Sequence, residues 1–328
     1  MASVKVAIVG ASGETGQSIV EGLLSSSSPK FEITALTRPE SIDKPVNANL
    51  KSRGITVVPV NLSGPPEQLV QALAGIDVVI SAIYFGSLAE EIPLANAAKA
   101  AGVKRFVQSA FMIVVPPRGV VDFREKKEEN LNHIQKIRLP YTYLDVGWWF
   151  QITLPRLPSG RIDYILPSTQ PDLPIGLDGN VPSALADIRD VGRYVARVIA
   201  DPRTLNKKVH VYNEIYTRNQ VYDLLEKLSG EKLERRYMSE RDADARIQEA
   251  RSALKKEPTD PSALAALITS QLFFSWGIRG DNTPEYAEYL GYLNGKDLYP
   301  DFKFTKLEEY VKEVLEGKAK GVYQSFSK

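Results

Sequence analysis

The order of apolar and polar positions in the first 150 residues predicts buried strands that alternate with amphipathic helices. Continuous apolar runs such as Val78-Val79-Ile80 are typical of parallel strands that helices cover on both faces. Strands are expected at Val4–Val9, Phe31–Thr37, Ile55–Val60, Asp77–Ile83, Arg105–Ser109 and Tyr141–Val146. Helices are expected between them at Thr15–Leu24, Pro66–Ala74, Leu88–Ala101 and Asp122–Ile137. The pattern therefore predicts an α/β fold with a Rossmann-like, doubly wound parallel sheet.

The regular alternation stops after Trp148. The later elements are expected at Ile188–Ile199 (helix), Lys208–Tyr212 (strand), Asn219–Leu228, Glu240–Leu254, Ser262–Phe274 and Lys306–Leu315 (helices). They indicate a smaller mixed α/β lobe that is expected to bind the substrate and that sends strands back to the main sheet. We therefore expect two units, residues 1–150 and residues 151–328.

A glycine-rich turn, Gly10-Ala11-Ser12-Gly13-Glu14-Thr15-Gly16, joins the first strand to the first helix. Gly10 permits a tight turn, Gly13 lets phosphates approach the backbone, and Gly16 lets the helix pack closely on the strand. Free N–H groups and the helix dipole meet there and form a site for a pyrophosphate. The turn predicts a dinucleotide ligand for residues 1–150; the alternative is that the glycines serve only the turn.

The end of the second strand indicates which dinucleotide is bound. An NAD site usually places Asp or Glu there to bind the ribose 2′-hydroxyl. Here the residue is Arg38, whose planar fork suits a 2′-phosphate. The expected cofactor is NADP(H), unless Arg38 is simply a surface residue at a strand end. Ligands of such sheets bind beyond the carboxyl ends of the strands. This rule places five residues around one crevice: Gly10, Arg38, Ala82, Ser109 and Gly147.

Charge and cysteine content exclude several classes of function. The chain has 328 residues, with 41 Lys and Arg against 40 Asp and Glu, so neither nucleic acid nor an anionic membrane is an expected partner. The absence of cysteine excludes disulfides, thiol nucleophiles and thiolate metal sites. Two histidines, His133 and His210, argue against a histidine metal site. No secretory signal precedes the first strand, and Leu264–Ile278 is short for a membrane span, so a cytoplasmic protein is expected.

A reductase needs a proton donor or acceptor beside the hydride, and short-chain dehydrogenases use Tyr with Lys four residues later. Only Tyr292 with Lys296 and Tyr299 with Lys303 have that spacing. Both pairs lie in a C-terminal segment interrupted by glycine and proline, so we attribute the spacing to chance.

The helix expected at Asp122–Ile137 offers a better candidate. Its apolar stripe runs through Phe123, Leu131 and Ile134, and Lys127 falls on that stripe. Burial there would lower the pKa of Lys127 toward neutrality and make it a general acid or base. Neighbouring Lys126 lies on the polar side together with Asn130 and His133. The alternative for Lys127 is a side chain that snorkels to water near the helix start.

Much of the chain resembles the NADPH-dependent isoflavone reductase and phenylcoumaran benzylic ether reductase family, within the NmrA-like atypical short-chain dehydrogenases. Besides the glycine turn, the resemblance rests on Ala35–Arg38, Asp77–Ser81, Ala98–Ser109, Leu139–Tyr143, Asp187–Gly192, Asp201–Lys207 and Leu298–Phe304. It implies NADPH-dependent reduction of an aromatic or phenolic small molecule, with Lys127 as the proton shuttle.

The resemblance also implies the rest of the site. The implied cofactor residues are Gly10, Ser12, Gly13, Glu14, Thr15, Gly16, Arg38, Ala82, Ile83, Ser109, Ala110, Lys127, Gly147 and Trp149. The implied substrate pocket consists of Tyr84, Phe85, Phe111, Met112 and Trp148. The protein is expected to be a monomer or a homodimer.

The chain departs from the family at positions around the nicotinamide and the substrate. Leu131 stands where the family often has arginine, and only Lys44 loosely matches a second phosphate-binding lysine. Two family loops are replaced here by Gln108–Met112 and Gly147–Trp149. The substrates of the family therefore cannot be assigned to this chain. Trp148, Trp149 and Phe150 could form an aromatic wall or belong to the core. Two other functions stay open: a non-catalytic NADP(H) redox sensor, and an isomerase or cyclase that keeps its cofactor.

Overall fold

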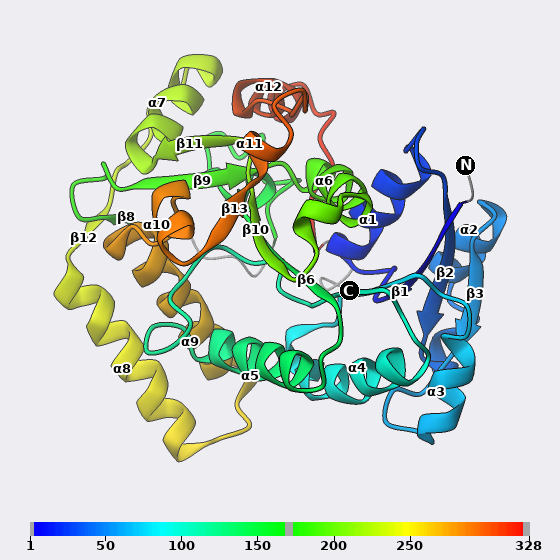
Figure 1. Cartoon of the computed structure of the whole chain (residues 1–328). Helices are drawn as coiled ribbons and strands as arrows, with labels where there is room; N and C mark the ends of the chain where they lie inside the picture. The colour runs from blue at the N-terminus through cyan, green and yellow to red at the C-terminus, as the bar shows by residue number, and fades with distance from the viewer. Residues whose placement is uncertain (1–2, 168–172, 324–328) are drawn as a thin grey trace.

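An eight-stranded sheet forms the centre of the computed structural model, which describes residues 3–167 and 173–323 (Figure 1). All neighbouring strands in it are parallel. In spatial order they are β3 (Thr56–Pro59), β2 (Phe31–Thr37), β1 (Val4–Val9), β4 (Val78–Ser81), β5 (Arg105–Val107), β6 (Tyr141–Val146), β10 (Lys207–Val211) and β13 (Tyr292–Asn294). The strand order reverses between β1 and β4, as in dinucleotide-binding folds, and the predicted Rossmann-like fold is confirmed.

Helices cover both faces of the sheet because its strands are apolar on both sides. In β1, Val6 and Ile8 belong to one buried cluster, and Ala7 and Val9 belong to the cluster on the opposite face. The first face is covered by α1 (Glu14–Leu24), α2 (Pro45–Ser52) and α6 (Ile188–Ala200). The second face is covered by α3 (Pro66–Ala72), α4 (Glu91–Ala100) and α5 (Asp122–Lys136).

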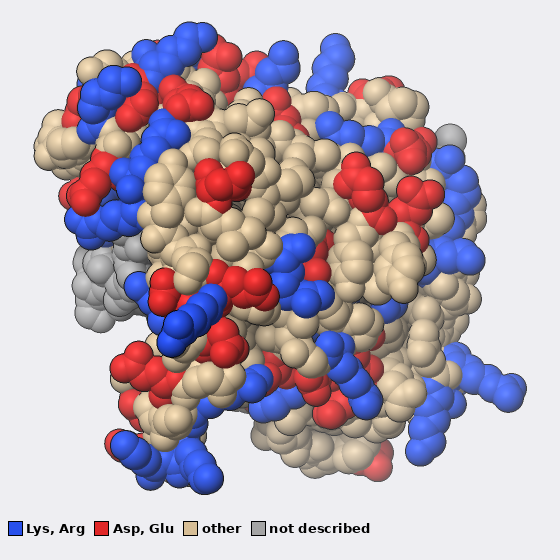
Figure 2. All heavy atoms as spheres, turned by 90° about the vertical axis from the view of Figure 1, so that its left-hand side faces the viewer, with Lys and Arg blue, Asp and Glu red and all other residues tan. Residues whose placement is uncertain are grey.

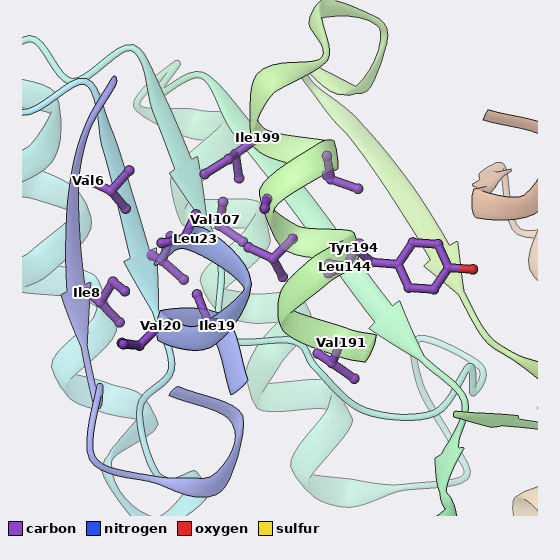
Figure 3. Close-up of a cluster of buried hydrophobic side chains, with 14 of the residues drawn as sticks. Val6, Ile8, Ile19, Val20, Leu23, Val107, Leu144, Val191, Tyr194 and Ile199 are labelled. Atoms are coloured by element: carbon purple, nitrogen blue, oxygen red, sulfur yellow. The ribbon is translucent and has the colours of Figure 1, made fainter. Parts of the chain in front are cut away.

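Helices α1 and α6 cross with their backbones in contact, and Figure 3 shows their apolar side chains meeting over the sheet. A Cβ atom on Gly192 would lie 1.7 Å from the Ser18 carbonyl oxygen, and one on Gly22 would lie 2.1 Å from the Gly192 carbonyl carbon. The Ser18 hydroxyl donates to the Ile188 carbonyl and accepts from the Gly192 N–H at 2.9 Å. Only glycine fits this crossing, which joins the first half of the chain to the second.

Besides α6, the described part of the second half adds short strands and six helices at one end of the main sheet. A three-stranded sheet consists of β7 (Trp148–Trp149), β9 (Pro182–Ala186) and β11 (Glu214–Thr217), and β8 (Ile175–Gly176) pairs with β12 (Tyr237–Met238). The helices are α7 (Arg218–Ser229), α8 (Glu240–Lys256), α9 (Pro261–Phe273), α10 (Pro284–Tyr289), α11 (Gly295–Leu298) and α12 (Leu307–Leu315). Strands β10 and β13 return to the main sheet, and the boundary at residue 150 stays a prediction.

The structure corrects several element boundaries and adds short elements. The strands expected at Asp77–Ile83 and Arg105–Ser109 end earlier, because the chain turns at the sheet edge before the apolar run is finished. The helix expected from Leu88 begins at Glu91, after a 3₁₀ segment, η2 (Phe85–Glu90). Helix α2 and the strands of the second half other than β10, which have two to five residues, were missed, because runs this short carry little periodicity.

The apolar helix near residue 270 is longer than the sequence indicated. Helix α9 continues into the π-helical segment η5 (Phe274–Arg279), so Pro261–Arg279 is long and apolar enough to cross a membrane by length and composition alone. Of its most apolar window, 44% is buried inside the fold, and a single helix of this kind is weak evidence for a membrane span. On the side that carries α8, positive and negative side chains are interspersed (Figure 2).

Candidate functional site

The glycine turn after β1 is shaped by close backbone contacts. Gly10 has φ +84°, and a Cβ there would lie 2.3 Å from the Ala82 carbonyl oxygen at the end of β4. A Cβ on Gly16 would lie 2.0 Å from the Gly10 carbonyl oxygen, whereas one on Gly13 would make an ordinary 3.5 Å contact. The structure therefore requires glycine at positions 10 and 16 for the turn itself. The packing of the turn does not explain the glycine at position 13.

The N-terminus of α1 opens at the carboxyl edge of the sheet. Its N-cap is Gly13, and no side chain caps the first turn. Ser12 and Gly13 are exposed, and Glu14 and Thr15 are partly exposed. An uncapped helix N-terminus behind a bare glycine backbone fits a pyrophosphate group.

Arg38 stands at the end of β2 on the same edge, with 56% of its side chain exposed. Its Nη2 donates to Ser87 Oγ at 3.0 Å and lies 3.5 Å from Glu90 Oε1. Both partners belong to η2, which follows β4. The guanidinium is thus held beside the turn while much of it stays accessible to an anion.

Lys127 lies inside the protein, with 5% of the residue exposed. Its amine donates to the carbonyl oxygens of Ser109 and Ala110, the second at 3.1 Å. Burial lowers the pKa of Lys127 to about 8. The snorkelling alternative is therefore wrong, and the side chain has the perturbed acidity expected of a proton donor or acceptor.

A tight turn after β5 presents the two carbonyls to Lys127. Phe111 has φ +43°, which is rare for a residue with a side chain, and its N–H donates to the Leu144 carbonyl at 2.8 Å. Gln108 Nε2 donates to the Lys127 carbonyl at 2.5 Å, which ties the turn to α5. The Phe111 side chain packs against the core under α1 and α6.

A buried carboxylate, Glu91, lies on the other side of this turn. Its Oε1 accepts from the Ser109 N–H at 2.7 Å, and its Oε2 accepts from Asn130 Nδ2 at 2.9 Å. Asn130 also donates to the Leu88 carbonyl at 2.9 Å. Placing Asn130 on the polar side of its helix was therefore wrong, because Leu88 of η2 and Glu91 at the start of α4 cover it.

A second buried network lies one turn before Lys127 on α5. The Arg124 guanidinium is fully buried and donates to Asp145 Oδ2 at 2.7 Å and to Glu128 Oε1 at 2.9 Å. Tyr292 OH donates to the same Asp145 oxygen at 2.7 Å. The sequence provided no signal for this ion pair, since charged residues on a helix usually face water.

An apolar wall lies next to Lys127. The Phe123 ring centroid is 5.9 Å from the Lys127 amine, and Met112 and Trp148 pack against the same buried cluster. The rings of Trp148 and Trp276 lie 5.5 Å apart. Four residues were missed as candidates, because the apolar runs that contain them indicated only core packing: Phe123, Leu272, Phe274 and Trp276.

Tyr84 and Phe85 lie apart from this wall, on the loop that follows β4. They are 60% and 39% exposed, and their ring centroids are 4.2 Å apart. Ala82 and Ile83 precede them, and the Ile83 carbonyl accepts from Ser109 Oγ at 3.1 Å. The loop is thus anchored at its base and open at its aromatic tip.

The C-terminal segment reaches the same edge of the sheet. The Tyr323 N–H donates to Glu14 Oε1 at 2.8 Å, and its ring stacks on Trp149 with centroids 6.0 Å apart. Burial and, secondarily, the Glu14 charge raise the pKa of Tyr323 to about 12. Gly147 is pressed against β9, where a Cβ would lie 2.6 Å from the Leu185 carbonyl carbon.

The described ranges contain no group of three or more His, Cys, Asp or Glu residues that could hold a metal ion. His210 is buried in β10, and burial lowers its pKa to about 3, so the imidazole is neutral. The candidate chemistry thus depends on Lys127, the glycine turn and Arg38.

The chain is similar to known proteins in sequence and in fold. A sequence model of the NmrA-like family matches residues 2–311. The chain is 60% identical to asnovolin J 5′,6′-dehydrogenase of Aspergillus novofumigatus, over 96% of each chain. It is 31% identical to phenylcoumaran benzylic ether reductase Betv6 of Betula pendula, over 95% of this chain and 98% of the relative. The solved structure of AtPrR2 with NADP⁺ and (+)-pinoresinol is similar with a TM-score of 0.75, at 26% identity over 96% of this chain and 99% of that one.

Proposed function

The chain belongs to the NmrA-like family, among its isoflavone reductase-like members, and from this premise we propose that it is an NADP(H)-dependent oxidoreductase acting on an apolar small molecule of specialised metabolism. Hydride transfer is the chemistry that the nicotinamide supplies when bound. The glycine turn would hold the pyrophosphate, and Arg38 would bind the 2′-phosphate. NADP⁺ in the AtPrR2 structure supports the choice of cofactor.

One observation carries the catalytic part of the proposal: Lys127 is a buried amine with a pKa of about 8 at the edge where the dinucleotide would lie. In reduction, hydride adds to a substrate carbon, and the Lys127 ammonium gives its proton to the substrate oxygen. In dehydrogenation, the neutral amine takes that proton back while hydride leaves the carbon. The carbonyls of Ser109 and Ala110 hold the amine in place for both directions.

The wall beside Lys127 supports a bulky, apolar substrate with a phenol or a conjugated carbonyl. Phe123, Met112 and Trp148 offer flat and flexible apolar surface, and the Lys127 amine lies 5.9 Å from the Phe123 ring centroid. One relative is named as the dehydrogenase of asnovolin J, and another structure contains pinoresinol. Asnovolin J is therefore the first substrate to assay and pinoresinol the second.

Replacing Arg38 with aspartate is expected to weaken NADPH binding about 100-fold and to change NADH binding by less than about threefold, because a carboxylate repels the 2′-phosphate. Fluorescence titration of both nucleotides measures the two dissociation constants.

Arg53→Asp is the matched control for that variant. Arg53 lies at the end of α2 and pairs with Glu21 of α1. Its replacement by aspartate changes the charge by the same amount, but away from the proposed phosphate site. Its NADPH affinity should stay at the parent value. Equal losses of NADPH and NADH affinity in Arg38→Asp would remove Arg38 from the phosphate site.

The pH dependence of turnover should follow Lys127. Its pKa in the free protein is lowered to about 8, so kcat/KM for reduction should be constant below pH 8 and fall above it, because the ammonium is needed. For dehydrogenation kcat/KM should rise through the same midpoint. Rates measured between pH 6 and 10 in both directions test this, and profiles without a midpoint near 8 would contradict it.

The decisive experiment for the function is an assay of the full chain with NADP(H) and asnovolin J in both directions, followed at the absorbance of the reduced nicotinamide. Turnover supports the proposal. Tight NADP(H) binding without turnover of either substrate, together with capture of a protein partner, would instead favour a redox sensor.

A further inference from the structure

We propose that Glu91 is the positioning residue of Lys127: its buried carboxylate holds the Ser109 turn against the lysine and supplies the negative charge that favours the ammonium form. This inference rests on the proposed function, in which Lys127 moves the proton. It adds a residue from α4, on a different element from the lysine that it serves.

Glu91 and Lys127 both contact one short segment, the turn at Ser109. The Ser109 N–H donates to Glu91 Oε1 at 2.7 Å, and the Ser109 carbonyl accepts from the Lys127 amine. Ser109 itself is buried, and its hydroxyl donates to the Ile83 carbonyl. The backbone that orients the amine is thus fixed from the opposite side by the carboxylate.

The Glu91 carboxylate and the Lys127 amine are both buried, and both form hydrogen bonds with neutral groups. Glu91 is 0% exposed and accepts from a backbone N–H and an amide side chain. Lys127 donates to two backbone carbonyls. Two opposite charges solvated by the dipoles of a shared turn stabilise each other more strongly than a pair in water would.

The other two charges that face Lys127 act in opposite directions. Asp145 on β6 raises the pKa of Lys127, and Arg124 on α5 lowers it. These two groups form an ion pair with each other at 2.7 Å. Burial acts most strongly on Lys127, and the Glu91 charge is the main influence opposing burial. Without Glu91, the amine would lose its proton at a lower pH.

The test is a titration of Lys127 in the full chain by NMR of ¹³Cε-labelled lysine, with its signal assigned from Lys127→Met. In Glu91→Gln the midpoint should fall by about one pH unit, because a neutral amide replaces the charge while keeping the size. Glu129→Gln is the matched control, because Glu129 lies on the same helix as Lys127 but is exposed. Its midpoint should match that of the parent.

Glu91→Asp keeps the charge one methylene farther away. Its midpoint should lie between those of the parent and Glu91→Gln, and it carries the test if the glutamine variant does not fold. An unmoved midpoint in a folded variant would overturn the inference. Loss of packing alone would not place the midpoints in the order parent, Glu91→Asp, Glu91→Gln. The titration needs neither cofactor nor substrate. Failure of the proposed function would instead appear as unchanged turnover in Lys127→Met.

Discussion

Lys127→Met is expected to lower kcat by about 10²- to 10⁴-fold, the range that a positioned proton donor contributes. Methionine keeps the length and apolar body of lysine but has no proton to give. NADPH affinity should change by less than about threefold, because the loss concerns the transition state. Steady-state rates with asnovolin J, together with nucleotide titrations, separate these effects.

The fold should survive this substitution. Lowering the pKa of Lys127 from 10.5 to about 8 means that the charged form costs the folded protein about 3 kcal/mol below pH 8. Methionine removes that cost but leaves two buried carbonyls without their donor, which costs a similar amount. Above about pH 10.5 the lysine is neutral in both states, so the cost of burying its charge is absent there.

Lys126→Met is the matched control, because Lys126 directly precedes Lys127 on the same helix and is exposed. It should keep the parent kcat. Unchanged turnover in Lys127→Met would remove the lysine from the chemistry.

Gly192→Ala is expected to destabilise the protein by about 3 kcal/mol or more, at the upper end of what overpacking costs. The added Cβ would lie 1.7 Å from the Ser18 carbonyl oxygen, which is backbone and cannot rotate away. The two helices would have to separate, and the apolar cluster between α1 and α6 would loosen (Figure 3). Urea unfolding of the purified variants measures the change in unfolding free energy.

Gly13→Ala is the control for this effect. Its Cβ would make an ordinary 3.5 Å contact, and Gly13 has φ −76°, which alanine adopts readily. It should stay within about 1 kcal/mol of the parent in stability, and instead weaken NADPH binding at the phosphate turn. Equal stability of Gly192→Ala and Gly13→Ala would show that the helix crossing can relax.

Features with a strong local pattern could be predicted from the sequence. The glycine turn was recognisable because strand, turn and helix follow one another directly between Val4 and Leu24. Lys127 was recognisable because a lysine interrupts an apolar stripe with helical spacing, and the structure buries it. The sheet followed from apolar runs that leave no polar face.

Features that depend on distant contacts could not be predicted. Glu91 and Arg124 look like ordinary helix charges, and only the packing of α4, α5 and β6 buries them. Tyr323 donates a hydrogen bond to Glu14, which lies 309 residues earlier in the sequence, and no local pattern predicts such a contact. Phe274 and Trp276 lie in a π-helical segment, where the usual helical spacing no longer indicates which side chains face inward.

The glycine crossing of α1 and α6 limits how this scaffold can be recombined. A chimera that joined residues 1–150 to the second half of a relative would need a residue without a side chain opposite Ser18. The same crossing implies that residues 1–150 expressed alone would expose the apolar flank of α1 that α6 covers. The two halves should therefore unfold as one cooperative unit, and interchangeable modules should be sought in the surface loops.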